Sequence, residues 1–221
     1  MRPSRRVRLA VKRAIDVAGA VTGLVLLGPV MAWTAVAIAA TMGRPIFFRQ
    51  MRPGLRGRPS LIWKFRTMRA PRRGEVWFDS DAARVTRLGA FLRATSVDEL
   101  PELWNVLRGD MSLVGPRPLL MEYLDHYTPE ESRRHDMRPG ITSWAAVNGR
   151  HTARFEDRLV LDTWYVDHWS LSLDVRIIAM TLAQVVRREA VAVTQGQEID
   201  FPERFQVALQ HGEGGPEGRR T

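Results

Sequence analysis

The longest apolar stretch of the 221-residue chain lies between Asp16 and Arg44, where no charged residue occurs. It exceeds the roughly 20 apolar residues that a membrane-spanning helix needs. Gly28 and Pro29 fall near its middle, and a proline there removes a backbone hydrogen bond and bends a helix. The pattern therefore predicts a long N-terminal membrane helix with a break at Gly28-Pro29.

Three forms of this helix fit the pattern. A secretory signal peptide also starts with basic residues, but this apolar stretch is too long for the core of one. A single spanning helix would place its two ends on opposite sides of the membrane. Basic residues flank both ends, so the positive-inside rule favours both ends in the cytoplasm, as in a re-entrant helix. The residues alone leave the spanning and re-entrant forms equally supported.

Extended and helical patterns follow the membrane stretch. Residues 45–54 and 60–68 predict a β-hairpin, with Lys64 and Arg66 on one face at period two. Residues 84–93 predict a short basic helix, and Thr128 has the pattern of a helix start. Two amphipathic helices are expected over residues 154–165 and 172–188.

The second amphipathic helix has an apolar side. It is made of Val175, Ile178, Leu182, Val185 and Val186. A stripe of this kind usually faces a protein core. The aromatic residues nearby, Trp164, Tyr165 and Trp169, suggest the alternative that these helices lie at a membrane interface.

The chain is strongly basic, with 33 Lys and Arg residues against 24 Asp and Glu, a net charge of +9. Such a balance indicates an anionic partner: nucleic acid, an anionic membrane surface or a phosphorylated substrate. No nucleic-acid-binding motif is recognisable, so we expect no nucleic-acid partner. There is no cysteine, which excludes disulfides, thiolate nucleophiles and cysteine metal sites.

Candidate chemistry concentrates between Thr95 and Pro118. Asp98 and Glu99 are adjacent carboxylates, and Arg117 stands between Pro116 and Pro118. Carboxylates hold hard cations and a guanidinium forks onto phosphate oxygens, so the group suits a metal-bound diphosphate. The alternative is structural: Ser96 and Glu99 have the spacing of a helix capping box.

Several motifs in this order resemble the bacterial sugar transferase family, the monotopic phosphoglycosyl transferases. They are Lys12-Arg-x-x-Asp16, Lys64-Phe-Arg-Thr-Met, Thr86-Arg-Leu-Gly, Asp98-Glu-Leu-Pro, Asn105-Val-Leu-Arg-Gly-Asp-Met-Ser, Gly115-Pro-Arg-Pro, Arg138-Pro-Gly-Ile-Thr and Val147-Asn-Gly-Arg150. The resemblance is to the minimal form of the family, similar to the members that initiate bacterial N-glycan assembly. The chain departs from the usual pattern at Ser143, Ala146 and His151.

The resemblance implies transfer of a sugar 1-phosphate from a UDP-sugar to polyprenyl phosphate, with release of UMP. Asp98 would be the nucleophile that forms a phosphosugar-aspartate, and Asp98 and Glu99 would hold Mg²⁺. Arg117 would clamp a phosphate oxygen. Weaker candidates for substrate binding are Lys64, Arg66, Arg87, Arg93 and Arg150.

The resemblance also implies the architecture: a mostly helical α+β fold with a re-entrant membrane helix, a small β-hairpin and interfacial helices around a compact catalytic domain. We expect a membrane segment at residues 1–43, a cytoplasmic catalytic domain at 44–193 and a disordered tail at 194–221. The enzyme would lie at the inner leaflet of a bacterial inner membrane, as a monomer or homo-oligomer. The alternatives are a membrane-bound diphosphate hydrolase and a membrane-anchored basic binding protein.

Overall fold

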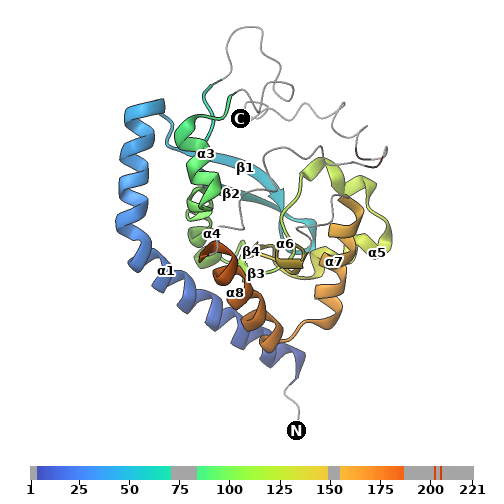
Figure 1. Ribbon diagram of the computed structural model, residues 1–221. Coiled ribbons are helices and arrows are strands. Elements are labelled where there is room, and N and C mark those ends of the chain that lie inside the picture. The colour runs from blue at the N-terminus through green and yellow to red at the C-terminus, as the bar shows by residue number, and fades with distance from the viewer. Residues whose placement is uncertain (1–3, 71–83, 149–154, 187–201, 203–204, 206–221) are drawn as a thin grey trace.

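The computed structural model describes residues 4–70, 84–148 and 155–186, together with Pro202 and Phe205. Helices and short strands alternate along the described chain (Figure 1). In chain order they are α1 (Arg5–Met42), β1 (Phe47–Pro53), η1 (Leu55–Gly57), β2 (Pro59–Phe65), α3 (Arg87–Ala94), η2 (Val97–Glu99), α4 (Glu102–Arg108), β3 (Ser112–Val114), η3 (Met121–His126), α5 (Pro129–Ser132), η4 (Arg133–Asp136), β4 (Gly140–Thr142), α6 (Trp144–Asn148), α7 (Phe155–His168) and α8 (Leu171–Val186). The predicted mostly helical α+β fold is confirmed.

The long apolar helix predicted at the N-terminus is α1, which runs unbroken for 38 residues. Figure 1 shows it along one edge of the molecule, bent rather than straight. Pro29 lies inside it and accounts for a bend, because its ring displaces the preceding turn and it donates no backbone hydrogen bond. By length and composition α1 is able to cross a membrane. Its re-entrant course stays a prediction.

Both halves of α1 pack against the same globular part. In the first half, Lys12, Asp16 and Ala20 are buried at intervals of four residues, as expected for one face of a helix. Gly19 allows close approach there, because a Cβ on it would lie 2.6 Å from Leu113. In the second half, Ile38 is fully buried in a cluster that includes residues of β2 and α3.

The predicted hairpin is confirmed, with β1 and β2 antiparallel and Phe47 opposite Phe65. The fully buried Asn105 fastens α4 to β2. Its Nδ2 donates to the Leu61 carbonyl at 2.7 Å, and its Oδ1 accepts from the Trp63 amide at 3.1 Å. This pair of bonds repeats the pattern of a β ladder, so α4 is fixed beside the strand that carries Lys64.

The second, parallel sheet is formed by β3 and β4. Gly115 and Gly140 let the two segments approach closely, because a Cβ on Gly140 would lie 2.0 Å from the Gly115 nitrogen. Gly115 immediately precedes the Pro-Arg-Pro segment, so this contact helps to fix the position of the Arg117 backbone.

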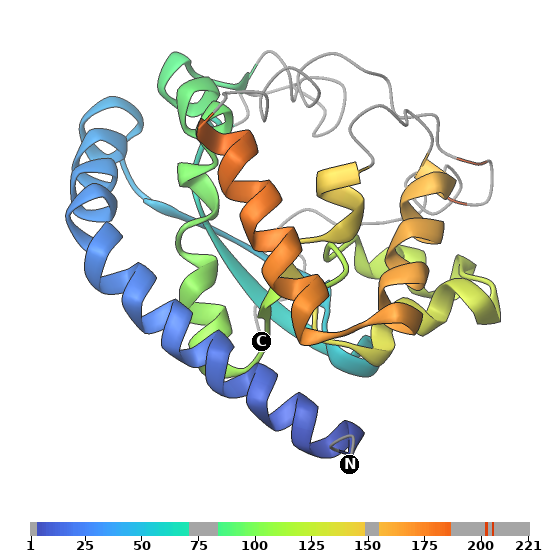
Figure 2. The same ribbon diagram turned by 60° about the horizontal axis from the view of Figure 1, so that its bottom comes forward.

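Each sequence interpretation of α7 and α8 fits only part of these helices. Tyr165 and Trp169 are buried in the core, so their predicted place at a membrane interface is wrong. The stripe on α8 does not face the core either: Val175 is 63% exposed and Leu182 61%. Asp174 and Ile177 are the buried side of the helix instead. Figure 2 shows α8 crossing between α1 and α7.

The predicted tail is described only at Pro202 and Phe205. Phe205 is fully buried and stacks edge-on against Phe155 and Tyr123, with ring centroids 4.8 and 5.1 Å apart. At this residue the chain is packed, which differs from the disorder expected for residues 194–221.

Candidate active site

The two candidate carboxylates lie on η2, a single 3₁₀ turn between α3 and α4. The capping box predicted at Ser96 is wrong. Ser96 has φ 55°, in the left-handed region, and its side chain makes no capping bond. The structure has a capping box at Thr128 and Glu131 instead, at the start of α5. The Glu99 side chain therefore takes no part in a cap, and it contacts Lys64 of β2 instead.

Glu99 is held by two cations. Its Oε1 accepts from Lys64 Nζ at 2.6 Å and from an Arg117 guanidinium nitrogen at 3.1 Å. Burial alone would raise the pKa of Glu99, but the charges and hydrogen bonds of Arg117 and Lys64 outweigh it and lower the pKa to about 2. Glu99 therefore stays ionised. The structure brings together three of the predicted site residues: Lys64, Glu99 and Arg117.

A third carboxylate, Glu102, was not predicted from the sequence. It is 2% exposed, and its Oε1 lies 3.2 Å from Lys64 Nζ. Burial raises the pKa of Glu102 to about 7, and the negative charge of Glu99 adds to the effect. The spacing of three residues from Glu99 was the available signal, because it corresponds to about one helical turn.

Asp98 is the least engaged of the carboxylates. In the part of the chain that the structure describes, its carboxylate takes part in no ion pair. The cations whose charges lower its pKa are Lys64, Arg93 and Arg117. Burial, followed by the negative charge of Glu99, raises the pKa of Asp98 to about 6, although the three cations act in the opposite direction. The result is a carboxylate that is ionised at neutral pH and free to react.

The Pro-Arg-Pro segment is pinned by a buried arginine. Arg134 is 1% exposed, donates to the Arg117 backbone carbonyl at 2.6 Å and forms an ion pair with the buried Asp162. The Arg117 guanidinium is thereby left to reach Glu99. Sequence reasoning missed this support, because Arg134 and Asp162 lie 17 and 45 residues beyond Arg117 and match no local pattern.

The remaining predicted cations are scattered. Arg93 donates to Thr67 Oγ1 at 3.0 Å and lies near enough to Asp98 to lower its pKa. Arg66 points elsewhere: it donates to the carbonyls of Met42, Gly43 and Arg44 at the end of α1. Arg87 is exposed in the first turn of α3.

For Arg66 and Arg87, contact with substrate stays a prediction. Arg150 lies outside the described residues.

Two further arginines crowd Arg117. Burial, followed by the charge of Arg117, lowers the pKa of Arg52 to about 10. The pKa of Arg158 is also lowered, by burial and then by Arg117. Like charges gathered in this way repel one another, and an anion bound among them would relieve the repulsion.

Comparison with known proteins decides the family. The family model described as bacterial sugar transferase matches residues 7–188. The chain belongs to the bacterial sugar transferase family. This membership makes it an enzyme that transfers a sugar-containing group, as the motifs predicted.

Relatives of this sugar transferase have informative names. The uncharacterized sugar transferase EpsL of Bacillus subtilis (strain 168) is 44% identical over 186 residues, which cover 84% of this chain and 92% of EpsL. The UDP-glucose:undecaprenyl-phosphate glucose-1-phosphate transferase of Escherichia coli (strain K12) is 37% identical over 81% of this chain and 41% of its own length. A protein of the same name from Caulobacter vibrioides is 40% identical, over 79% of this chain and 69% of its own.

Proposed function

We propose that this sugar transferase moves a sugar 1-phosphate from a UDP-sugar to polyprenyl phosphate and releases UMP. The observation that carries the proposal is the unpaired Asp98 carboxylate beside a Glu99 fixed by Lys64 and Arg117. A reactive carboxylate within a fixed set of cations suits attack on a diphosphate. The names of the E. coli and Caulobacter relatives support undecaprenyl phosphate as the acceptor.

In the first step, a carboxylate oxygen of Asp98 attacks the β-phosphorus of the UDP-sugar. The bond between that phosphorus and the oxygen bridging to the α-phosphate breaks, and UMP leaves with the bridging oxygen. Asp98 then carries the sugar phosphate as an acyl phosphate. The pKa of about 6 keeps most of Asp98 ionised at pH 7, without the protein having to supply a base.

In the second step, a phosphate oxygen of polyprenyl phosphate attacks the same phosphorus. The bond between phosphorus and the Asp98 oxygen breaks, which restores the carboxylate and yields polyprenyl diphosphosugar. Covalent catalysis of this kind divides one displacement into two, so that UMP departs before the lipid reacts.

Arg117, Lys64 and Arg93 would stabilise the charge of the diphosphate during both steps. Arg117 is the best placed, because its backbone is held by two prolines and by Arg134 while half of its side chain is exposed to the site. Lys64 would hold Glu99 in place, which keeps one carboxylate of the pair fixed.

The donor chemistry of the site fits Mg²⁺, with Asp98 and Glu99 as the protein ligands. Among the described residues, no group of three or more metal-binding side chains occurs. Mg²⁺ is often held by one or two carboxylates, with substrate phosphates and water completing its shell. When bound, the ion would offset diphosphate charge and stabilise the leaving UMP. Its binding would compete with the ion pairs that Glu99 makes with Lys64 and Arg117.

For the membrane helix we propose the re-entrant course. Lys12 of the first half of α1 and Ile38 of the second half both pack against one globular part, which supports placing both ends on one side of the membrane. That side would be the cytoplasmic face of a bacterial inner membrane. Exposed apolar residues would complete the contact with lipid. They are Val25, Leu26, Trp33 and Val36 on α1, Phe91 on α3, and Val175 and Leu182 on α8.

The orientation is open to a direct experiment, because the chain contains no native cysteine. Single cysteines at Ser4 and Gly57 should both be protected from an impermeant reagent in intact cells. Labelling at Ser4 would show a spanning helix. Pro29→Ala should straighten α1 and move part of the population to that spanning form.

The activity itself is tested by a screen of UDP-sugars with undecaprenyl phosphate, with UMP release as the readout. A transferase releases about one equivalent of UMP without the lipid and turns over only when the lipid is added. Continuous UMP release without the lipid would show a diphosphate hydrolase, and no release with any UDP-sugar would overturn the proposal.

A further inference from the structure

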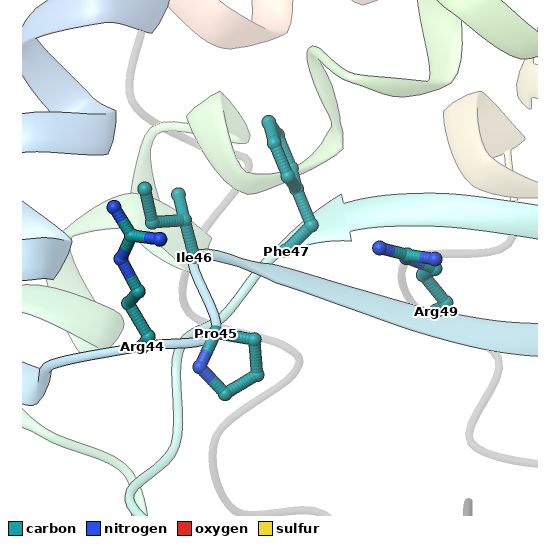
Figure 3. Close-up of a pocket in the computed structure, with 5 residues that line it drawn as sticks. All are labelled: Arg44, Pro45, Ile46, Phe47 and Arg49. Carbon is teal, nitrogen blue, oxygen red and sulfur yellow. The ribbon is translucent and has the colours of Figure 1, made fainter.

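A pocket of about 490 Å³ lies where the chain leaves α1 and enters β1. Its lining consists of Arg44, Pro45, Ile46, Phe47 and Arg49. Figure 3 shows the guanidinium groups of Arg44 and Arg49 at the two ends of this stretch, with the apolar side chains between them. The pocket thus combines two positive charges with an apolar wall.

Neither arginine is neutralised by the protein. Among the residues that the structure describes, the Arg44 and Arg49 side chains form no ion pair. Arg49 is held over the ring of Trp63, with its guanidinium carbon 4.2 Å from the ring centroid. A cation–π contact orients a guanidinium without consuming its charge. A phosphate is the kind of anion that a guanidinium group of this kind would bind.

The apolar wall joins the membrane helix to the catalytic turn. Ile46 and Phe47 pack against the buried cluster of Ile38, Phe65 and Leu92, and Val97 of η2 packs against the same cluster. Val97 immediately precedes Asp98. An apolar chain lying along this wall would therefore run between the end of α1 and the side of the cluster that Val97 covers, with its charged end at one of the two arginines.

We propose that this pocket holds the phosphate and the first isoprene units of the acceptor lipid, polyprenyl phosphate. The inference rests on the proposed function, and adds to it the place where the acceptor binds. A molecule with an anionic head and a hydrocarbon tail matches both parts of the lining. The position beside the end of α1 gives such a lipid a route from the bilayer that does not cross water.

The proposal is tested with the double variant Arg44→Gln/Arg49→Gln. Its matched control is Arg56→Gln/Arg58→Gln, which removes two exposed arginines from the turn at the other end of the hairpin. Each protein is placed in nanodiscs of neutral phosphatidylcholine containing undecaprenyl phosphate. Two quantities are measured: the KM for undecaprenyl phosphate, and the single equivalent of UMP released from the UDP-sugar without lipid acceptor.

We expect the KM for undecaprenyl phosphate to rise about tenfold or more in the double variant, because no guanidinium remains at either end of the wall to bind the phosphate. The lipid-free release of UMP should be unchanged, and the control should match the wild type in both. Arg49→Lys should recover part of the loss. An unchanged KM in the double variant, or an equal rise in the control, overturns the proposal.

Two further outcomes have distinct meanings. If the variant differs from the wild type only when anionic phosphatidylglycerol is added to the nanodiscs, the pocket takes bulk phospholipid and the proposal is wrong. Failure of the wild type to release UMP would sink the proposed function instead. In that case, the undecaprenyl phosphate that each purified protein retains after detergent exchange, measured by mass spectrometry, still tests the pocket: retention by the double variant equal to the wild type contradicts it.

Discussion

One charged cluster, the anchor network, lies where the start of α1 meets β3 and α8 and consists of Lys12, Asp16 and Asp174. A second cluster lies beside Asp98 and consists of Lys64, Glu99, Glu102 and Arg117. In the anchor network all three residues are less than 8% exposed. Lys12 Nζ donates to Asp174 at 2.7 Å and to the Val114 carbonyl at 2.9 Å.

The carboxylates of the anchor network are also satisfied. Asp174 accepts from the Tyr165 hydroxyl at 2.7 Å and from the Trp169 indole at 3.1 Å. Asp16 accepts from Ser112 and from the Leu113 amide, at 2.8 and 3.0 Å. A buried charge cluster in which each oxygen has a donor fixes one arrangement of the elements around it.

The cluster beside Asp98 is balanced differently. Two cations crowd one oxygen of Glu99, while Asp98 and Glu102 have raised pKa values of about 6 and about 7. Arg52 and Arg158 repel Arg117 from nearby. The comparison teaches that buried charge is arranged in two ways in this enzyme: each carboxylate oxygen has a donor where α1 docks, and the pairing is incomplete among the described residues where we propose that a diphosphate binds.

The largest effect should come from breaking the anchor network with Lys12→Met. The change leaves Asp174 without its cation in a buried site, which typically costs about 3–5 kcal/mol of the free energy of unfolding. Chemical unfolding in detergent micelles measures this quantity. Arg5→Met is the control, since Arg5 is exposed and should change stability by less than about 0.5 kcal/mol. Equal stability of the two variants would show that the network does not anchor α1.

Arg117→Lys should act on catalysis rather than on stability. A lysine keeps the charge but cannot form a bidentate fork on phosphate, so we expect a loss of about 1.5–3 kcal/mol, or roughly ten- to a hundredfold in rate. The melting temperature should stay the same, because Arg134 holds the loop through the Arg117 backbone. Arg108→Lys, at another exposed arginine with a carboxylate partner, should leave the rate unchanged. An unchanged rate for Arg117→Lys would remove its role as a phosphate clamp.

Lys12→Met and Arg117→Lys change regions that could be predicted from the sequence to different extents. The apolar period of α1, the hairpin and the grouping of Asp98, Glu99 and Arg117 are local signals, and they could be predicted. Arg134 and Asp162 could not, because each acts on a residue that only the tertiary fold brings near. For Glu102 the one local signal was its spacing of three residues from Glu99, because its ion-pair partner Lys64 lies on β2.

The face of α8 shows a second limit. The sequence pattern correctly indicated an apolar stripe on α8, but it could not show which side of the helix packs against the protein. The buried side contains Asp174 and Ile177 instead of the stripe. Arg66 shows a third limit of prediction from the sequence. It continues the alternation of Lys64, but β2 ends at Phe65, so Arg66 is released to bind the end of α1.

The pH dependence of kcat/KM tests the environment of Asp98, which differs from that of the fully paired carboxylates of the anchor network. The protonated form of Asp98 is not a nucleophile, and its pKa is raised to about 6. The kcat/KM for the UDP-sugar should therefore be constant above pH 7 and fall as the pH is lowered through 6, approaching about tenfold per pH unit. Steady-state rates from pH 5 to 8 measure the profile. A constant kcat/KM down to pH 5 would contradict the assigned environment of Asp98.

The smallest effect should follow from Glu102→Gln. The folded-state pKa of Glu102, about 7, lies above its unfolded value of 4.5, so folding favours the protonated form. The wild type therefore loses stability as the pH rises from 5 to 7, and the glutamine variant should escape that loss. We expect the variant to gain about 1 kcal/mol relative to wild type between pH 6 and 8, in chemical unfolding at each pH. A difference independent of pH would show that Glu102 is ionised throughout.

The covalent adduct on Asp98 is the most direct test of the central claim. The enzyme is incubated with its UDP-sugar in the absence of polyprenyl phosphate, then digested and analysed by mass spectrometry. We predict one equivalent of released UMP, a sugar phosphate on the peptide containing Asp98, and neither product with Asp98→Asn. UMP release without an adduct, or an adduct on another residue, would contradict the account.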